Sequence, residues 1–242
     1  MILLAGLGLY AVARTTSAFA VDRVAVRGAP PEVSAEVRKA VAPALGESLL
    51  RLDLGDLLRR AENVPTVASA SIDRSFPHTL EISVVPEVPV AVLRQGPSSW
   101  LVAAGGRVLA ALDRGMRPGL PRIWLRRNVD VRVGESLQGL QRRAVAAVAP
   151  LVESPLPAAV TSVAVGGDQL NLALRSGIEV RLGDASDLAV KLEVARHVLP
   201  QLSGLRGYLD VSVPERPVAG ETTFDSQVEV ETPASTAPRA SD

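Results

Sequence analysis

The chain has 242 residues, 47% of them apolar, and its 26 basic side chains balance 26 acidic ones. This length suffices for one large domain or two small ones. Zero net charge argues against a general nucleic-acid binder, which needs a basic surface to displace counterions. Cysteine is absent, which excludes disulfides, thiolate metal sites and thiol catalysis. With two His and few aromatic residues, the composition favours binding over catalysis and predicts no metal and no cofactor.

The N-terminal segment predicts a membrane anchor over residues 1–21. Residues 1–13 are apolar without interruption, and Arg14 is the only charged residue before Asp22. A spanning helix needs about 20 apolar residues, and a long side chain such as Arg14 can reach the headgroups. A signal peptide cleaved after Ala20 and a buried core helix are the alternatives. Basic residues follow the run instead of preceding it, so we expect a basic cytoplasmic tail to be missing from the chain.

Residues 22–90 predict a small β-α-α-β-β unit. Apolar periodicity separates its helices from its strands, and Asp53 is a candidate N-cap with Asp56 as its capping partner. Residues 67–74 make a poor strand by propensity, whereas residues 79–85 alternate clearly. The expected elements are a strand at 22–28, a helix from Pro30-Pro31 to about Leu45, a helix from Leu54 to Val64, and strands at 67–74 and 79–85.

Residues 91–220 predict a larger mixed domain, joined to the first near residues 87–92. Its clearest signal is an antiparallel meander, in which Gly-rich turns separate runs of alternating apolar and polar residues. Ser136 is a candidate N-cap for the helix that comes before this meander, at about residues 137–152. The expected elements are strands at 100–102 and 108–112, a helix at about 137–152, strands at 163–165, 170–174 and 178–182, a helix at about 186–199, and a final strand at 208–213.

Residues 221–242 predict a disordered acidic tail, because five acids, one Arg and many Ser, Thr and Pro cannot bury enough apolar surface. The fold class is therefore α+β. A transmembrane helix precedes a small β-α-α-β-β domain and a larger domain with an antiparallel meander flanked by helices.

Three patterns that suggest chemistry are weak. The segment Gly6 to Ala11 fits a dinucleotide fingerprint, but no strand precedes it. The acids at Asp184, Asp187 and Glu193 lack the spacing of a calcium loop, and a helix cap at Asp184 or Ser186 explains them better. The Arg doublets are interpreted as solvated faces, with a patch for anionic lipid or polymer as the alternative; they lie at 59–60, 126–127 and 142–143.

Two segments resemble a POTRA domain: Phe19 to Gly28, and Val67 to Pro89 with Ser75-Phe76-Pro77 at its turn. POTRA domains occur in outer-membrane assembly proteins and in the FtsQ/DivIB cell-division family. The second half of the chain resembles FtsQ/DivIB at Gly177 to Gly183 with Lys191-Leu192, and at Tyr208 to Val218. The resemblance covers about residues 1–220. It departs from the family at Pro86-Glu87-Val88, where relatives usually carry an acidic-basic pair.

The resemblance implies a single-pass inner-membrane protein at the division septum, with its body outside the cytoplasm. It implies a non-enzymatic divisome scaffold that binds FtsB and FtsL, and through them influences septal peptidoglycan synthesis by FtsW and its transpeptidase. The POTRA domain serves in recruitment in relatives. Nucleic acid and small-molecule substrates are not implied. On the residues alone, a secreted two-domain binding protein and a cell-wall enzyme remain as alternatives.

A sheet that ends in a short strand leaves N–H and C=O groups unpaired, and a partner segment can add there by β-augmentation. The predicted partner-binding residues at this edge are Val211, Ser212, Val213, Arg216, Pro217 and Val218. Two alternatives stay open: the strand is central and an exit loop follows it, or the interface is the exposed face of the helix at 186–199.

Overall fold

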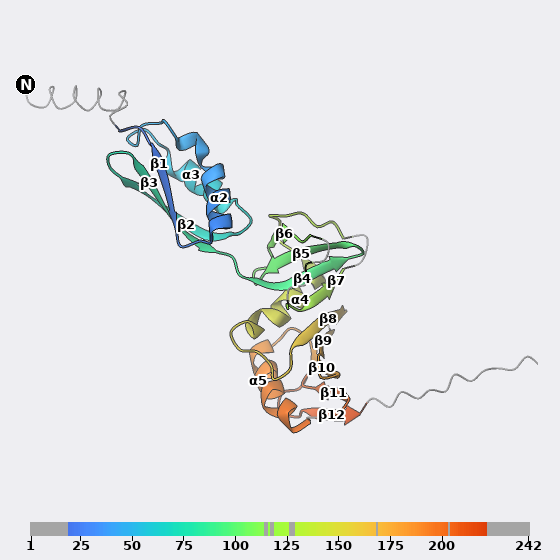
Figure 1. Ribbon diagram of the computed structural model, residues 1–242. Coiled ribbons are helices and arrows are strands. Elements are labelled where there is room, and N and C mark those ends of the chain that lie inside the picture. The colour runs from blue at the N-terminus through green and yellow to red at the C-terminus, as the bar shows by residue number, and fades with distance from the viewer. Residues whose placement is uncertain are drawn as a thin grey trace, which may run out of the picture.

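The computed structural model describes residues 19–113, 116, 119–125, 129–167, 169–202 and 204–221. Within them the chain forms one sheet of three strands and one of nine, and each sheet has its own hydrophobic core. Figure 1 shows the smaller sheet at the N-terminal end of the described chain and the larger sheet beyond it. No helix in this part of the chain is long and apolar enough to cross a membrane. The predicted tail lies outside the described residues, apart from Glu221.

The smaller unit has the predicted β-α-α-β-β order. Its central strand β3 pairs in parallel with β1 and antiparallel with β2. Helix α2 packs against β1, and helix α3 packs against β2. The elements are β1 (Arg23–Arg27), α2 (Pro31–Ala40), the 3-10 turn η2 (Ala42–Ala44), α3 (Leu54–Glu62), β2 (Val67–Ser75) and β3 (Thr79–Pro86).

Local sequence explains most of these boundaries. The carboxylate of Asp53 accepts the N–H of Asp56 at 3.0 Å, so the predicted cap of α3 is confirmed. Helix α2 ends at Ala40, earlier than expected, because Pro43 lacks an N–H and disfavours the helical conformation of the residue before it. Strand β2 forms in spite of its poor propensity because it pairs with β3 along most of its length.

Residues 19–21 belong to this unit and not to a membrane helix. The N–H of Val21 donates to the Glu47 carbonyl at 2.9 Å, and the N–H of Leu49 donates to the Phe19 carbonyl at 2.8 Å. Val21 is 1% exposed in the core of the unit. The prediction of an anchor over residues 1–21 is thus wrong at its C-terminal end, because the backbone there pairs with a neighbouring segment. The rest of that anchor lies outside the described residues.

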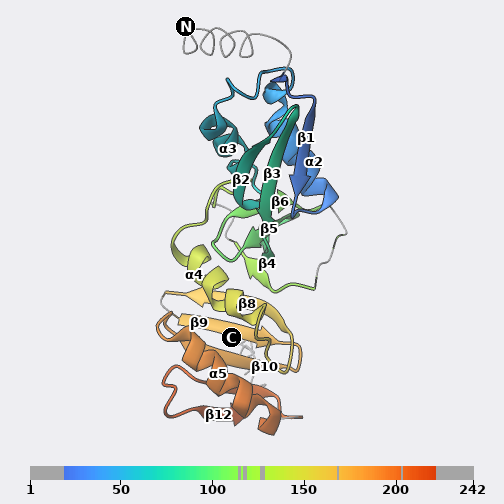
Figure 2. The ribbon, with the colours of Figure 1, turned by 90° about the vertical axis from the view of Figure 1, so that its left-hand side faces the viewer.

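The larger unit is built on a nine-stranded sheet in the order β12-β11-β10-β9-β8-β7-β4-β5-β6. Helix α4 contacts β8 and β4, helix α5 contacts β10, and Figure 2 shows both helices on the same face of the sheet. The elements are β4 (Pro89–Gln95), β5 (Ser98–Ala103), β6 (Val108–Ala111), β7 (Arg122–Trp124), α4 (Gly139–Val148), η3 (Ala149–Leu151), β8 (Val160–Gly166), β9 (Gln169–Leu174), β10 (Ile178–Gly183), α5 (Leu188–Val198), η4 (Leu199–Leu202), β11 (Gly207–Asp210) and β12 (Val218–Glu221).

The predicted meander is confirmed, since β8, β9 and β10 are consecutive antiparallel neighbours. Helix α4 starts later than predicted, and Ser136 does not cap it. Ser136 instead forms an isolated bridge with Arg107, which leaves Gln138 as the residue before the helix. Strand β4 begins at Pro89, so the last two residues of the predicted 22–90 segment belong to the larger sheet.

Arg107 connects the two units. Its guanidinium donates to the carbonyls of Glu62 and Val67, each at 3.0 Å, from the turn between β5 and β6. A backbone hydrogen bond from Glu87 to Thr66, at 2.9 Å, lies at the same junction. The contact engages the C-terminus of α3, where the helix dipole favours a cation.

Candidate partner-binding edge

The C-terminal strands form one end of the large sheet. After β10 the chain forms helix α5, which packs on one face of the sheet, and it returns as β11, which runs parallel to β10. It then turns back as β12, which pairs antiparallel with β11 and has no further strand beyond it among the described residues. The exposed edge therefore belongs to β12 and not to the predicted final strand at 208–213.

The predicted final strand stops at Asp210 for a local reason. The carboxylate of Asp210 accepts the N–H of Ser212 at 2.9 Å, which turns the backbone out of the strand. Val211 still donates its N–H to Arg181 on β10, at 2.9 Å, and is fully buried. The strand therefore ends three residues before the predicted limit of Val213.

The six predicted partner-binding residues do not form one continuous edge. Val211 lies in the core. Ser212, in the turn after β11, lies against Gly183 at the end of β10. Val213 and Arg216 lie in the loop between the two strands, where the Arg216 N–H donates to the Val213 carbonyl at 3.0 Å. Pro217 is exposed in the same loop, and only Val218, which is 54% exposed, belongs to the edge strand.

No described strand pairs with the outer side of β12, which leaves backbone groups at alternate residues available to a partner. The Gly220 carbonyl faces Gly207 on β11, so Gly220 directs its hydrogen-bonding groups inward. Hydrogen-bonding direction alternates along an antiparallel strand. The N–H and C=O groups of Ala219 and Glu221 consequently point away from the sheet, as an added strand requires. Sequence reasoning missed these two residues because Val-Ala-Gly-Glu carries little strand propensity.

An aromatic stack supports the edge strand on the sheet face away from the helices. The guanidinium of Arg181 lies over the Tyr208 ring, 4.0 Å from its centroid. The Tyr208 ring in turn covers Gly220, since a Cβ at position 220 would lie 2.8 Å from its Cε1 atom. The stack spans β10, β11 and β12, and glycine is the residue that leaves room for the ring.

A cavity of about 290 Å³ opens beside the same edge. Its walls come from the end of η4, the start of β11 and the C-terminal half of β12, and they are mostly apolar. The lining residues are Ile178, Leu202, Leu205, Gly207, Tyr208, Ala219, Gly220 and Glu221. A side chain of an added strand would find an apolar recess there, next to the outward backbone groups.

The acids near the start of α5 form an internal ion pair. Lys191 is 2% exposed, and its ammonium donates to the Asp184 carboxylate at 2.6 Å. Ser186 donates to the same carboxylate, and the two donors lower the pKa of Asp184 to about 2 from its ordinary 3.8. Asp184 thus holds Lys191 of the Lys191-Leu192 motif, and the residue before α5 is Asp187. Among the described residues, no three acidic or His side chains could hold a metal ion.

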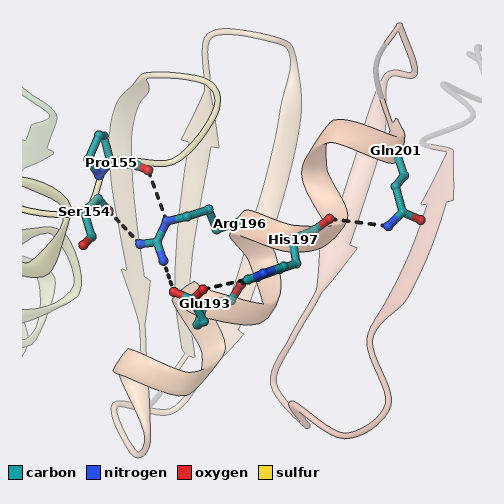
Figure 3. A network of polar contacts seen from close by, with 6 residues as sticks. All are labelled: Ser154, Pro155, Glu193, Arg196, His197 and Gln201. Carbon is teal, nitrogen blue, oxygen red and sulfur yellow. Dashed lines mark hydrogen bonds and ion pairs between the residues drawn. The ribbon is translucent and has the colours of Figure 1, made fainter.

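A second polar network attaches α5 to the loop before β8 (Figure 3). Arg196 donates to the Ser154 carbonyl at 2.8 Å and to the Pro155 carbonyl at 3.3 Å, and it pairs with Glu193. The Nδ1 atom of His197 lies 3.0 Å from the Glu193 carbonyl, on the helix itself. These contacts are structural, and they fix the helix that connects β10 to β11.

Comparison with known proteins identifies both units. Residues 19–85 match the POTRA domain of FtsQ type, and residues 91–212 match the C-terminal domain of the cell division protein FtsQ/DivIB. The cell division protein FtsQ of Streptomyces venezuelae is 30% identical over 225 residues, 90% of this chain and 80% of its own length. FtsQ of Streptomyces collinus is 27% identical over 204 residues, 82% of this chain and 76% of its own length. The chain belongs to the FtsQ/DivIB family of cell division proteins.

Proposed function

We propose that this chain is a non-catalytic scaffold of the division machinery that binds FtsB and FtsL outside the cytoplasm. Through them it influences septal peptidoglycan synthesis by FtsW and its transpeptidase. Family membership supports the division role, and the edge of β12 is the observation that supports partner binding. We also propose that residues 1–18 anchor the chain in the inner membrane, with the body on the extracytoplasmic side.

Binding follows from the hydrogen-bonding capacity of β12. A partner strand that pairs with the outward groups of Ala219 and Glu221 satisfies them without a change in the sheet. Backbone pairing supplies affinity, and the apolar cavity beside Tyr208 supplies specificity for alternate side chains of the added strand. The loop residues Arg216 and Pro217 lie directly before β12, where they can contact the same partner.

Two substitutions at one position test this mechanism. Ala219→Pro removes an outward N–H, and Ala219→Ser keeps it while changing the side chain. We expect the proline variant to lose at least about tenfold in affinity for a purified FtsB–FtsL complex, a loss equivalent to about 1.4 kcal/mol. The serine variant should bind within about twofold of the parent chain.

The measurement is equilibrium binding by the detergent-solubilised full chain, with circular dichroism to establish that each variant is folded. Full affinity in a folded Ala219→Pro variant would show that the partner does not pair with this edge. Equal losses in both variants would assign the effect to the side chain and would contradict backbone pairing.

A further inference from the structure

The end of the POTRA unit that faces away from the large sheet carries an exposed aromatic residue. Phe76 lies in the turn between β2 and β3 and is 53% exposed. Its ring meets the Phe19 ring edge-on, with the ring centroids 5.7 Å apart. Figures 1 and 2 both show this turn beside the first described residues, at the opposite end of β2 from the large sheet.

Hydrogen bonds hold the turn against the N-terminal residues. The N–H of Asp22 donates to the His78 carbonyl at 2.9 Å, and the Nδ1 atom of His78 lies 3.0 Å from the Ala20 carbonyl. Phe19 itself packs against the core of the unit. The position of Phe76 relative to Phe19 is therefore fixed, and whatever holds residue 19 also places residue 76.

Phe19 lies a short distance after the uninterrupted apolar stretch of the sequence. Residues 1–13 contain no charged side chain, and only residues 14–18 separate them from Phe19. Even if the anchor ended at Ala13, the six peptide steps from Ala13 to Phe19 would extend to at most about 22 Å. The polar interface of a bilayer is about 6 Å deep on each side of the hydrocarbon core. With the proposed anchor of residues 1–18, Phe19 is the first residue outside the anchor, and Phe76, whose ring contacts the Phe19 ring, therefore lies close to the headgroups.

We propose that Phe76, together with Phe19, contacts the lipid bilayer and seats the β2–β3 end of the POTRA unit on the membrane surface. This inference rests on the proposed anchoring of the chain by its N-terminal segment. Phe, like Trp and Leu, is a residue that membrane-surface segments bury at the boundary between headgroups and acyl chains. Because the anchor holds the β2–β3 turn close to the bilayer, the effective concentration of the membrane surface at the turn is high. The single exposed ring of Phe76 is then enough to keep the turn in contact with the membrane for much of the time.

The charges around the turn indicate a contact that does not select anionic lipid. Asp73 and Arg74 carry opposite signs just before the turn, and Asp22 lies on the neighbouring segment. The Arg74 guanidinium donates to the carbonyls of Leu49 at 2.6 Å and Leu52 at 3.0 Å. Its hydrogen bonds are thus engaged within the unit, and the apolar rings remain as the membrane-facing feature.

The absence of cysteine allows a direct test with single labels on the full chain. Phe76→Cys and Ser69→Cys place one environment-sensitive fluorophore either at the turn or near the other end of β2, about 23 Å away. Both positions are exposed. The chain is reconstituted into vesicles of neutral phosphatidylcholine, with or without brominated acyl chains. Ser75→Cys serves as a second turn label in case Phe76→Cys disturbs the fold.

We expect brominated lipid to quench the label at position 76 about twofold or more and to leave the label at position 69 unchanged. Equal and negligible quenching at both positions, in chain that resists alkaline carbonate extraction, would overturn the membrane contact while leaving the anchor intact. Release of the chain by carbonate would overturn the anchoring itself, and the contact with it.

Discussion

A left-handed backbone and a close neighbour restrict position 183 to glycine. Gly183 has a φ of +69°, and a Cβ there would lie 2.7 Å from the Cβ of Ser212. Gly183→Ala should therefore destabilise the large domain by about 2 kcal/mol. Gly166, also at a strand end of the meander, has no atom within 4 Å of an added Cβ. Gly166→Ala should cost less than about 1 kcal/mol by urea denaturation. Equal costs at the two positions would contradict this account of Gly183.

The Asp184–Lys191 pair makes stability depend on acid pH. The pKa of Asp184 is lowered to about 2, so its contribution is complete above the ordinary value of 3.8. The contribution is lost as the pH falls through about 2. Asp184→Asn should therefore be less stable than the parent chain at neutral pH, and the difference should shrink between pH 4 and pH 2.

Urea denaturation at a series of pH values measures this difference. Asp187→Asn is the control, because the Asp187 side chain makes no capping hydrogen bond to α5. If the stability difference between Asp184→Asn and the parent stayed constant down to pH 2, the loss of stability in acid would not come from the Asp184–Lys191 ion pair.

At the scale of elements, Arg196 determines how firmly the loop before β8 is held. Its guanidinium on α5 donates to the Ser154 and Pro155 carbonyls of the loop (Figure 3). Arg196→Ala should speed amide hydrogen exchange in residues 153–158 about tenfold, since this loop would open without unfolding α5. His197→Ala is the matched control, because the His197 side chain is 74% exposed and its ring contacts Glu193 on the same helix. Equal exchange rates in both variants would mean that residues 153–158 are held by their own packing and not by Arg196.

Elements with local signals could be predicted from the sequence. The turn at Gly177 and the alternation on either side of it predict β9 and β10, and the helical stripe with Asp53 as its cap predicts α3. Strand β4 was missed because it is buried on both faces and shows no alternation between Val90 and Leu93.

The candidate site could be predicted only in outline. The sequence predicts a sheet edge at a final strand over residues 208–213, whereas the structure places the edge at β12, which shares only Val218 with the predicted partner-binding residues. Which strand forms that edge depends on the return of the chain as β12, a short strand that forms by pairing with β11. The sequence therefore predicts partner-binding residues in the loop between β11 and β12, such as Ser212 and Val213, and not Ala219 and Glu221 on the edge strand.

At the scale of the molecule, Arg107 sets the relation between the two units. Each unit has its own core, and we expect each to keep its fold when the junction is weakened. Arg107→Ala should broaden the distance distribution between spin labels at Lys39→Cys and Val152→Cys, because the carbonyls of Glu62 and Val67 lose their shared donor.

Arg142→Ala controls for a change in the same turn. Arg142 donates to the Gly105 carbonyl at 2.8 Å, entirely within the large unit. Its removal should leave the inter-unit distance unchanged. A broadening of equal size in both variants would mean that the turn, and not the Arg107 bridge, holds the units together.

The central claim is that a partner strand adds to β12. Amide hydrogen exchange of the full chain, with and without the FtsB–FtsL complex, tests it most directly at single-residue resolution. The outward N–H groups of Ala219 and Glu221 should become protected on binding, while the exposed face of α5 (Leu188–Val198) exchanges as before. Protection confined to α5, with β12 exchanging at its free rate, would contradict the claim and place the interface on the helix.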